Sequence, residues 1–100
     1  MEKSKKENPY VVVRTYSAGV HTGELVSQKG KEVVLKNSRR IWYWKGATTL
    51  SQLAMEGVKY PDECKFAQPV DSITLTEAIE IIPCKPEAVK NIKAVPEWKI

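Results

Sequence analysis

The sequence predicts an α+β fold: a small, strongly bent antiparallel sheet or partly open small barrel, with one short internal helix and a C-terminal helix. Three observations predict it. β-branched and aromatic runs punctuated by glycine fill the first half of the chain, a helix-capping signal follows them, and a second β-type run precedes an amphipathic segment. The 100 residues suit one domain. We place it at residues 9–100, after a flexible charged tail at residues 1–8.

Four strands are predicted in the first half of the chain, over residues 10–16, 20–28, 31–36 and 39–45. Their β-branched and aromatic content favours extended backbone. Gly30 supplies the positive φ that a tight hairpin between the second and third strands requires. Asn37 and Ser38 predict a corner between the third strand and the fourth.

A short helix follows the fourth strand. Thr49 and Gln52 form a capping-box signal, and Gly57 lies where the helix should end, after about two turns. Residues 58–69 contain prolines and polar residues, which predict an irregular connection.

The last third of the chain predicts one more β segment and a terminal helix. Residues 72–82 carry spaced isoleucine and leucine, which indicate a strand pair or one bent strand. Pro86 and Glu87 suit the first turn of a helix, and Pro96 should end it.

Composition excludes several classes of protein. No apolar run approaches the ~20 residues of a membrane span, and the N-terminal residues lack the apolar segment of a signal or transit peptide, so we expect a cytoplasmic protein without a membrane partner. The net charge of +4 includes tail lysines, so the folded part is too weakly basic for a dedicated duplex-DNA binder.

Cys64 and Cys84 should be reduced thiols, and His21 lies too far from them in sequence for a zinc site. No metal and no cofactor is predicted.

Cations and aromatics are concentrated in residues 38–45. On a strand, alternation places Arg40, Trp42 and Trp44 on one face and Arg39, Ile41, Tyr43 and Lys45 on the other. Guanidinium groups bind phosphate and aromatic rings stack on bases, so either face suits a nucleotide. The alternative is that the tryptophans belong to the core or to a subunit interface, with Arg40 at its rim.

A second candidate is the loop between the first two strands. Arg14, Ser17 and His21 should converge there, and a cation together with a hydroxyl could bind an anion. Catalysis is not expected, because Glu24 should point to the face opposite His21 and no carboxylate would orient the ring. The alternative is that His21 makes a structural hydrogen bond at the turn.

Two resemblances add context. Residues 23–27 and 33–37, with Gly30 between them, resemble the second and third strands of SH3-like and Sm-like barrels. Over residues 10–83 the chain also resembles a family of small, uncharacterised proteins encoded by tailed phages and prophages. The motifs are VVRTYSAGVH (12–21), GKEVVL (30–35), RRIWYWKGA (39–47) and AIEIIPC (78–84).

The resemblance to phage proteins implies action in the cytoplasm of an infected bacterial host, and it implies no mechanism. Small non-structural phage proteins often inhibit host defences. Several families of them sequester cyclic or ADP-ribose-type nucleotide signals in pockets at oligomer interfaces.

The leading hypothesis is therefore a homo-oligomeric anti-defence protein that is not an enzyme and that sequesters a nucleotide-derived immune signal. The expected ligand-binding residues are Arg39, Arg40, Trp42, Tyr43, Trp44 and Lys45, with Arg14, Ser17 and His21 as a second wall. Three alternatives stay open: an inhibitor that binds a host defence protein, a single-stranded nucleic-acid-binding small barrel, and, least favoured, a hydrolase of nucleotide signals.

Overall fold

The computed structural model describes residues 8–98 and confirms the α+β class. The tail expected at residues 1–8 lies outside the described residues except for Asn8. The elements are β1 (Tyr10–Thr15), β2 (Val20–Lys29), β3 (Glu32–Tyr43), α1 (Leu50–Glu56), the 3-10 turn η1 (Pro61–Glu63), β4 (Lys65–Phe66), β5 (Val70–Leu75), β6 (Ala78–Pro83) and α2 (Pro86–Ala94). The expected short helix, irregular connection and terminal helix are all present.

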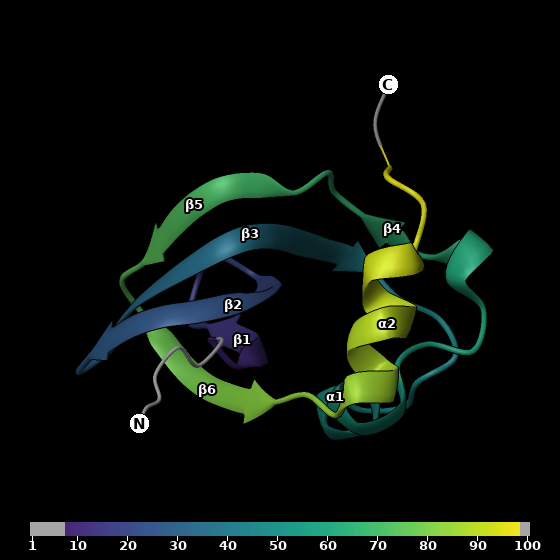
Figure 1. Cartoon of the computed structure of the whole chain (residues 1–100), viewed down its shortest axis with the longest axis horizontal. Helices are drawn as coiled ribbons and strands as arrows, with labels where there is room; N and C mark the ends of the chain where they lie inside the picture. The colour runs from purple at the N-terminus through teal and green to yellow at the C-terminus, as the bar shows by residue number, and fades with distance from the viewer. Residues whose placement is uncertain (1–7, 99–100) are drawn as a thin grey trace, which may run out of the picture.

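The strands form one curved antiparallel sheet. Its order is β4-β3-β2-β1-β6, and β5 pairs with β3 on the same edge as β4. The segment predicted as a strand pair over residues 72–82 is two strands, which pair with β3 and β1 on opposite sides of the sheet. Figure 1 shows the sheet curling between β5 and β6, with both helices gathered at one end.

The prediction of two strands separated by a corner at Asn37 is wrong, because β3 is continuous. Asn37 takes a positive φ of 52° inside the strand. Between Thr22 and Glu24 of β2 the register shifts, and β3 holds one residue more than β2, which is a bulge. Gly23 lies at this bend, where an added Cβ would meet the Lys36 carbonyl oxygen and the Ser38 Cα at 3.1 Å. The tight approach of the two strands therefore favours glycine.

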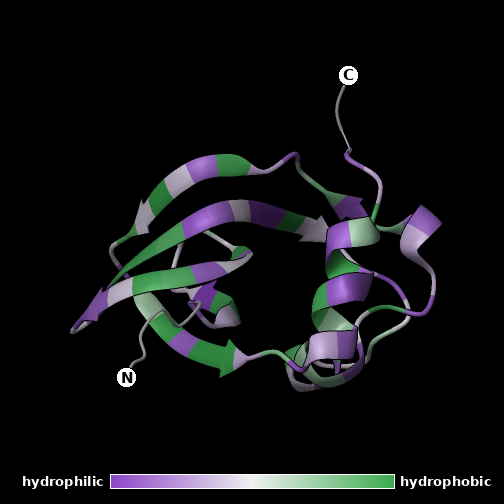
Figure 2. Cartoon of the chain, viewed as in Figure 1, coloured by the Kyte–Doolittle hydropathy of each residue, from purple (hydrophilic) through white to green (hydrophobic). Residues whose placement is uncertain are grey.

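Two apolar clusters cover the two faces of β1. Val11 and Val13 pack inside the curved sheet, whereas Tyr10 and Val12 face the helices. This double burial explains why β1 is a continuous apolar run rather than an alternating one. In Figure 2 the exposed strands instead alternate between hydrophobic and hydrophilic residues, as on β5.

The helices are fixed by polar side chains as well as by apolar packing. Thr49 caps α1 by accepting a hydrogen bond from the Gln52 backbone N–H at 3.1 Å, as its capping signal predicts. Asn91 of α2 binds both backbone groups of Val58, accepting from its N–H at 2.8 Å and donating to its carbonyl at 2.9 Å. The loop after α1 is thereby attached to α2.

Arg39 holds the sheet, the C-terminal end of α2 and the segment after it together. The side chain is only 3% exposed. Its Nε donates to the Ala67 carbonyl at 2.8 Å and its Nη1 to the Ile92 carbonyl at 2.9 Å. Its Nη2 donates to the carbonyls of Phe66 at 3.2 Å and Pro96 at 3.4 Å. Figure 1 shows the parts it connects: the C-terminal end of α2 lies beside β4 and the end of β3.

Replacing Arg39 with alanine should lower the free energy of unfolding by about 3 kcal/mol or more, because buried carbonyl groups lose their donors. Arg39→Lys should recover only part of this, since an ammonium cannot reproduce the guanidinium fork. Urea denaturation of the purified variants measures both effects.

Arg14→Ala is the matched control, since the Arg14 side chain is 52% exposed and its ion pair with Glu80 spans 3.6 Å. It should change stability by no more than about 0.5 kcal/mol. Equal losses for Arg39→Ala and Arg14→Ala would contradict the structural role of Arg39.

Candidate functional site

The nine predicted ligand residues do not meet in one place. They fall into four environments. Arg39 is buried between the sheet and α2, and His21 is buried inside the sheet. The others lie at the exposed end of β3 (Arg40, Trp42, Tyr43, Lys45) or around the β1–β2 loop (Arg14, Ser17, Trp44). Each environment has its own chemistry.

The expectation that Arg39 contacts a phosphate requires correction. Its guanidinium is buried, makes four hydrogen bonds to carbonyl oxygens and lies 5.4 Å from the Phe66 ring centroid. A cation held in this way has a structural role, and a ligand would have to displace the C-terminal segment to reach it.

The end of β3 presents an exposed aromatic surface, which we define by Trp42, Trp98, Lys65 and Arg40. Trp42 is 65% exposed and Trp98 is 47% exposed. Their rings stack with centroids 6.1 Å apart and planes 12° from parallel. The Lys65 ammonium lies 5.3 Å from the Trp98 ring centroid. Arg40 is exposed and lies two residues before Trp42 on β3, whose pairing with β4 shifts register between Ile41 and Tyr43.

Trp98 and Lys65 were not predicted from the sequence. A parallel bridge between Phe66 and Glu97 brings the C-terminal segment alongside β4, and the backbone N–H of Trp98 donates to the Phe66 carbonyl at 2.9 Å. This pairing spans about thirty residues without any local sequence pattern. The one signal in the sequence that could have indicated this pairing is the large aromatic side chain of Trp98 near the C-terminus.

Tyr43 and Lys45 lie near the 3-10 turn. The Lys45 ammonium donates to Glu63 at 2.8 Å and lies 5.9 Å from the Tyr60 ring centroid. The hydrogen bond with Glu63 raises the pKa of Lys45. Because a carboxylate already compensates this cation, Lys45 is a weaker candidate for a phosphate than Arg40 or Lys65.

The β1–β2 loop does bring Arg14, Ser17 and Trp44 together, around an open cavity of about 460 Å³. Two carboxylates adjoin the predicted anion contacts: Arg14 pairs with Glu80 at 3.6 Å, and Ser17 donates to Glu77 at 2.8 Å. These negative charges disfavour a phosphate. Trp44 is half-buried and packs against the helix-side core.

His21 does not join this loop cavity, because its side chain is fully buried inside the sheet. Its Nε2 lies 3.0 Å from the Ala18 carbonyl, which matches the alternative interpretation of His21 as a structural histidine. Burial, and secondarily the charge of Arg40, lower the pKa of the imidazole, whereas the bond to Ala18 opposes this shift. Arg40 is its cross-strand partner on β3.

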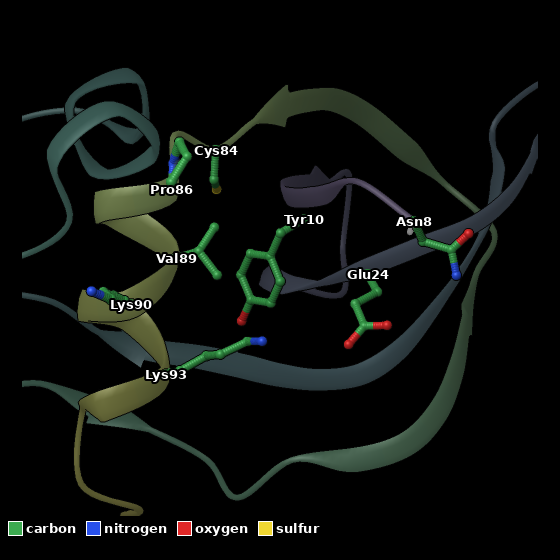
Figure 3. A pocket seen from close by; sticks show the side chains of 8 residues that line it. All are labelled: Asn8, Tyr10, Glu24, Cys84, Pro86, Val89, Lys90 and Lys93. Carbon is green, nitrogen blue, oxygen red and sulfur yellow. The ribbon is translucent and has the colours of Figure 1, made fainter. Parts of the chain in front are cut away.

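An open groove of about 750 Å³ lies beside α2, at a place that the sequence did not predict. Figure 3 shows the Tyr10 ring pointing toward Val89 and Lys93, with Glu24 on the other side. The Lys93 ammonium lies 5.5 Å from the Tyr10 ring centroid. A groove that carries both a carboxylate and ammonium groups has no single charge preference.

Neither a disulfide nor a metal cluster is found among residues 8–98. Cys64 and Cys84 are free thiols. Burial raises the pKa of Cys84 to about 11. No helix in the described part of the chain is long and apolar enough to cross a membrane.

Comparison with known proteins identifies the family without an activity. Residues 8–92 match the family model described as a domain of unknown function, DUF6948. Since the match covers most of the chain, the protein belongs to this family. No curated protein and no solved structure matches the chain.

The buried His21 predicts a loss of stability in mild acid. Because its folded pKa lies below the ordinary 6.5, the unfolded chain takes up the proton first, and the free energy of unfolding should fall as the pH drops below about 6.5. The sequence contains one histidine, so an NMR titration of its ring reports this group alone. A midpoint at or above 6.5 would contradict the buried neutral ring.

Cys84 should react slowly with iodoacetamide in the folded protein. A pKa raised from 9.0 to about 11 leaves roughly a hundredth of the usual thiolate at pH 8, and the thiolate is the nucleophile. Peptide mapping after timed alkylation measures the Cys84 rate separately from that of Cys64. Equal rates in folded and urea-unfolded protein would rule out the burial of this thiol.

Proposed function

We propose that the protein binds a nucleotide-derived ligand at the aromatic surface and sequesters it without turnover. The observation that carries this proposal is the stacked, exposed Trp42–Trp98 pair, with Lys65 over the Trp98 ring and the exposed Arg40 two residues before Trp42. Base stacking on an aromatic ring contributes about 1–3 kcal/mol per base. Arg40 and Lys65 would then bind the phosphates.

Charge distinguishes this surface from the other candidates. Among the described residues, neither Arg40 nor Lys65 forms an ion pair with a carboxylate, whereas Arg14 and Lys45 each do. A cation whose charge is uncompensated by a neighbour attracts a phosphate more strongly, because no existing pair has to be broken. The aromatic surface is therefore the best place for an anionic, base-containing ligand.

The absence of turnover is part of the proposal. The imidazole of His21 is buried and contacts the Ala18 carbonyl, so it has no orienting carboxylate in the described chain. A binder needs contacts to phosphate and base but no general base. The resemblance to small phage proteins supports an anti-defence role in the cytoplasm of an infected host, with the protein acting as a homo-oligomer.

A finer description of the fold also belongs to this proposal. We propose that the sheet is a partly open barrel of the SH3-like or Sm-like type. The strand order and the strongly curved β2–β3 hairpin support this description. A sheet curved in this way would explain why both faces of β1 are buried, one inside the curve and one against the helices.

A host defence protein is the second candidate ligand. Tyr43 and Tyr60 are 48% and 47% exposed, and together with Trp42 and Trp98 they concentrate exposed aromatics at one end of the molecule. Aromatic and arginine side chains dominate the binding energy of protein interfaces. A partner captured by the wild-type protein and lost from Trp42→Ala would favour this candidate.

Trp42→Ala and Arg40→Ala should each weaken nucleotide binding by at least about tenfold, since they remove a stacking ring and a phosphate contact. Calorimetric titration with cyclic dinucleotides, cyclic trinucleotides and ADP-ribose derivatives measures the affinity. Stability should be nearly unchanged, because both side chains are exposed.

The matched control is Tyr16→Ala, which removes a 78% exposed aromatic ring from the β1–β2 loop. It should bind like the wild type. Equal weakening by Tyr16→Ala and Trp42→Ala would refute the assignment of the site. Affinity that rises with oligonucleotide length and falls steeply with salt would instead identify a single-stranded nucleic-acid binder.

A further inference from the structure

A small cavity opens between β3 and the segment that leads into β5, with a volume of about 180 Å³. Its polar lining consists of His21, Ser38, Arg40 and Gln68, and its apolar lining of Ala67, Val70 and Ile73. Polar groups placed among apolar side chains are typical of ligand sites. Two of the polar residues come from deep inside the sheet: His21 is 0% exposed and Ser38 is 2% exposed.

Both buried residues present an unpaired polar atom. Within the described chain, the Nδ1 of His21 and the Oγ of Ser38 have no hydrogen-bond partner in the protein. Buried polar atoms are almost always paired, because an unpaired one costs the free energy of its lost hydration. His21 and Ser38 both line this cavity, and each therefore holds a polar group that the protein leaves unpaired.

The neighbouring carbonyl determines what Nδ1 can bind. A carbonyl oxygen only accepts, so the contact at 3.0 Å between Nε2 and Ala18 places the ring proton on Nε2. Nδ1 is then an acceptor with a free lone pair. Burial lowers the pKa of this ring and keeps it neutral. A phosphate or carboxylate oxygen would oppose one lone pair with another, so the group that fits here is a hydrogen-bond donor, such as the N–H of a nucleobase.

The size of the cavity limits that group to a fragment. Sites that enclose whole small molecules usually have volumes of about 300–1,000 Å³, and this cavity is smaller. Arg40 connects it to the aromatic surface, because Arg40 lines the cavity and lies two residues before Trp42 on β3. A ligand could thus place one part inside and its charged part at Arg40.

We propose that this cavity recognises the N–H-bearing edge of a nucleobase, which donates to His21 Nδ1 and contacts Ser38 Oγ, while the phosphate lies outside at Arg40. The inference rests on the proposed function, because it names the base edge of that ligand as the part that the protein recognises. Stacking on Trp42 supplies affinity for any base, whereas hydrogen bonds at a base edge supply selectivity.

The first test follows His21 directly. The full chain, labelled with ¹⁵N, is titrated with AMP, GMP, CMP and UMP, and with ribose 5-phosphate as the probe without a base. We expect the His21 Nδ1 resonance to shift with at least one of the four nucleotides and to stay unchanged with ribose 5-phosphate. An equal shift with ribose 5-phosphate would show that the sugar phosphate binds without a base, and no shift with any probe would indicate a cavity filled by water alone. Both results overturn the inference.

The second test uses Ser38→Ala, with Ser72→Ala as the matched control at an exposed position of β5. Ser38→Ala should weaken binding of the preferred nucleotide by about tenfold, as expected for one lost hydrogen bond, and Ser72→Ala should not change it. The melting temperature of the free Ser38→Ala protein should not fall, since its hydroxyl has no protein partner. A lower melting temperature with unchanged affinity would show a structural serine.

The two proposals fail in different ways. If Trp42→Ala weakens binding and Ser38→Ala does not, the aromatic surface binds the ligand and the cavity does not. If Ser38→Ala weakens binding and Trp42→Ala does not, the base edge is recognised in the cavity and the assignment of the aromatic surface as a stacking site is wrong. Normal binding by both variants contradicts both proposals.

Discussion

The arrangement of the chain depends on the burial of one cation, Arg39. A buried guanidinium is costly unless its donors are satisfied. The protein meets that requirement with main-chain carbonyls from β4, from the C-terminal end of α2 and from the segment after it. The partial negative charge of a helix C-terminus also favours a cation there. Satisfying Arg39 thus fixes the C-terminal segment against the sheet, and this segment carries Trp98 to its place beside Trp42.

Local signals predicted most of the fold. The capping pair Thr49 and Gln52, the hairpin at Gly30 and the proline at the start of α2 act within a few residues, so their outcome depends little on the rest of the chain. The corner predicted at Asn37 is wrong because the turn preference of asparagine is also satisfied by a bulge, and only pairing with β2 decides between a corner and a bulge. The partners of β5 and β6 could not be predicted either, because they are set by how the whole sheet curls.

The candidate site was predicted only in part, for a related reason. Alternation along β3 correctly separates exposed Arg40 and Trp42 from buried Ile41. It fails at Tyr43, which is exposed where the pairing with β4 shifts register, and at Trp44, which lies beyond the end of the strand and packs against the core. Composition cannot distinguish a cation that binds a phosphate from one that binds carbonyls. The partners of Arg39 lie 27 to 57 residues away in sequence, so its role follows from tertiary structure alone.

The exposed tryptophan pair has Lys65 beside it, and Arg40, two residues before Trp42 on β3, lines a small cavity. We propose that these parts together hold a nucleotide-derived molecule without altering it. The most direct test is to incubate the purified protein with a panel of such molecules, to filter it, and to analyse by chromatography both the filtrate and the fraction released by heat. We expect one molecule to disappear from the filtrate and to return intact on heating. A molecule that returns altered, or a panel that stays entirely in the filtrate, would contradict it.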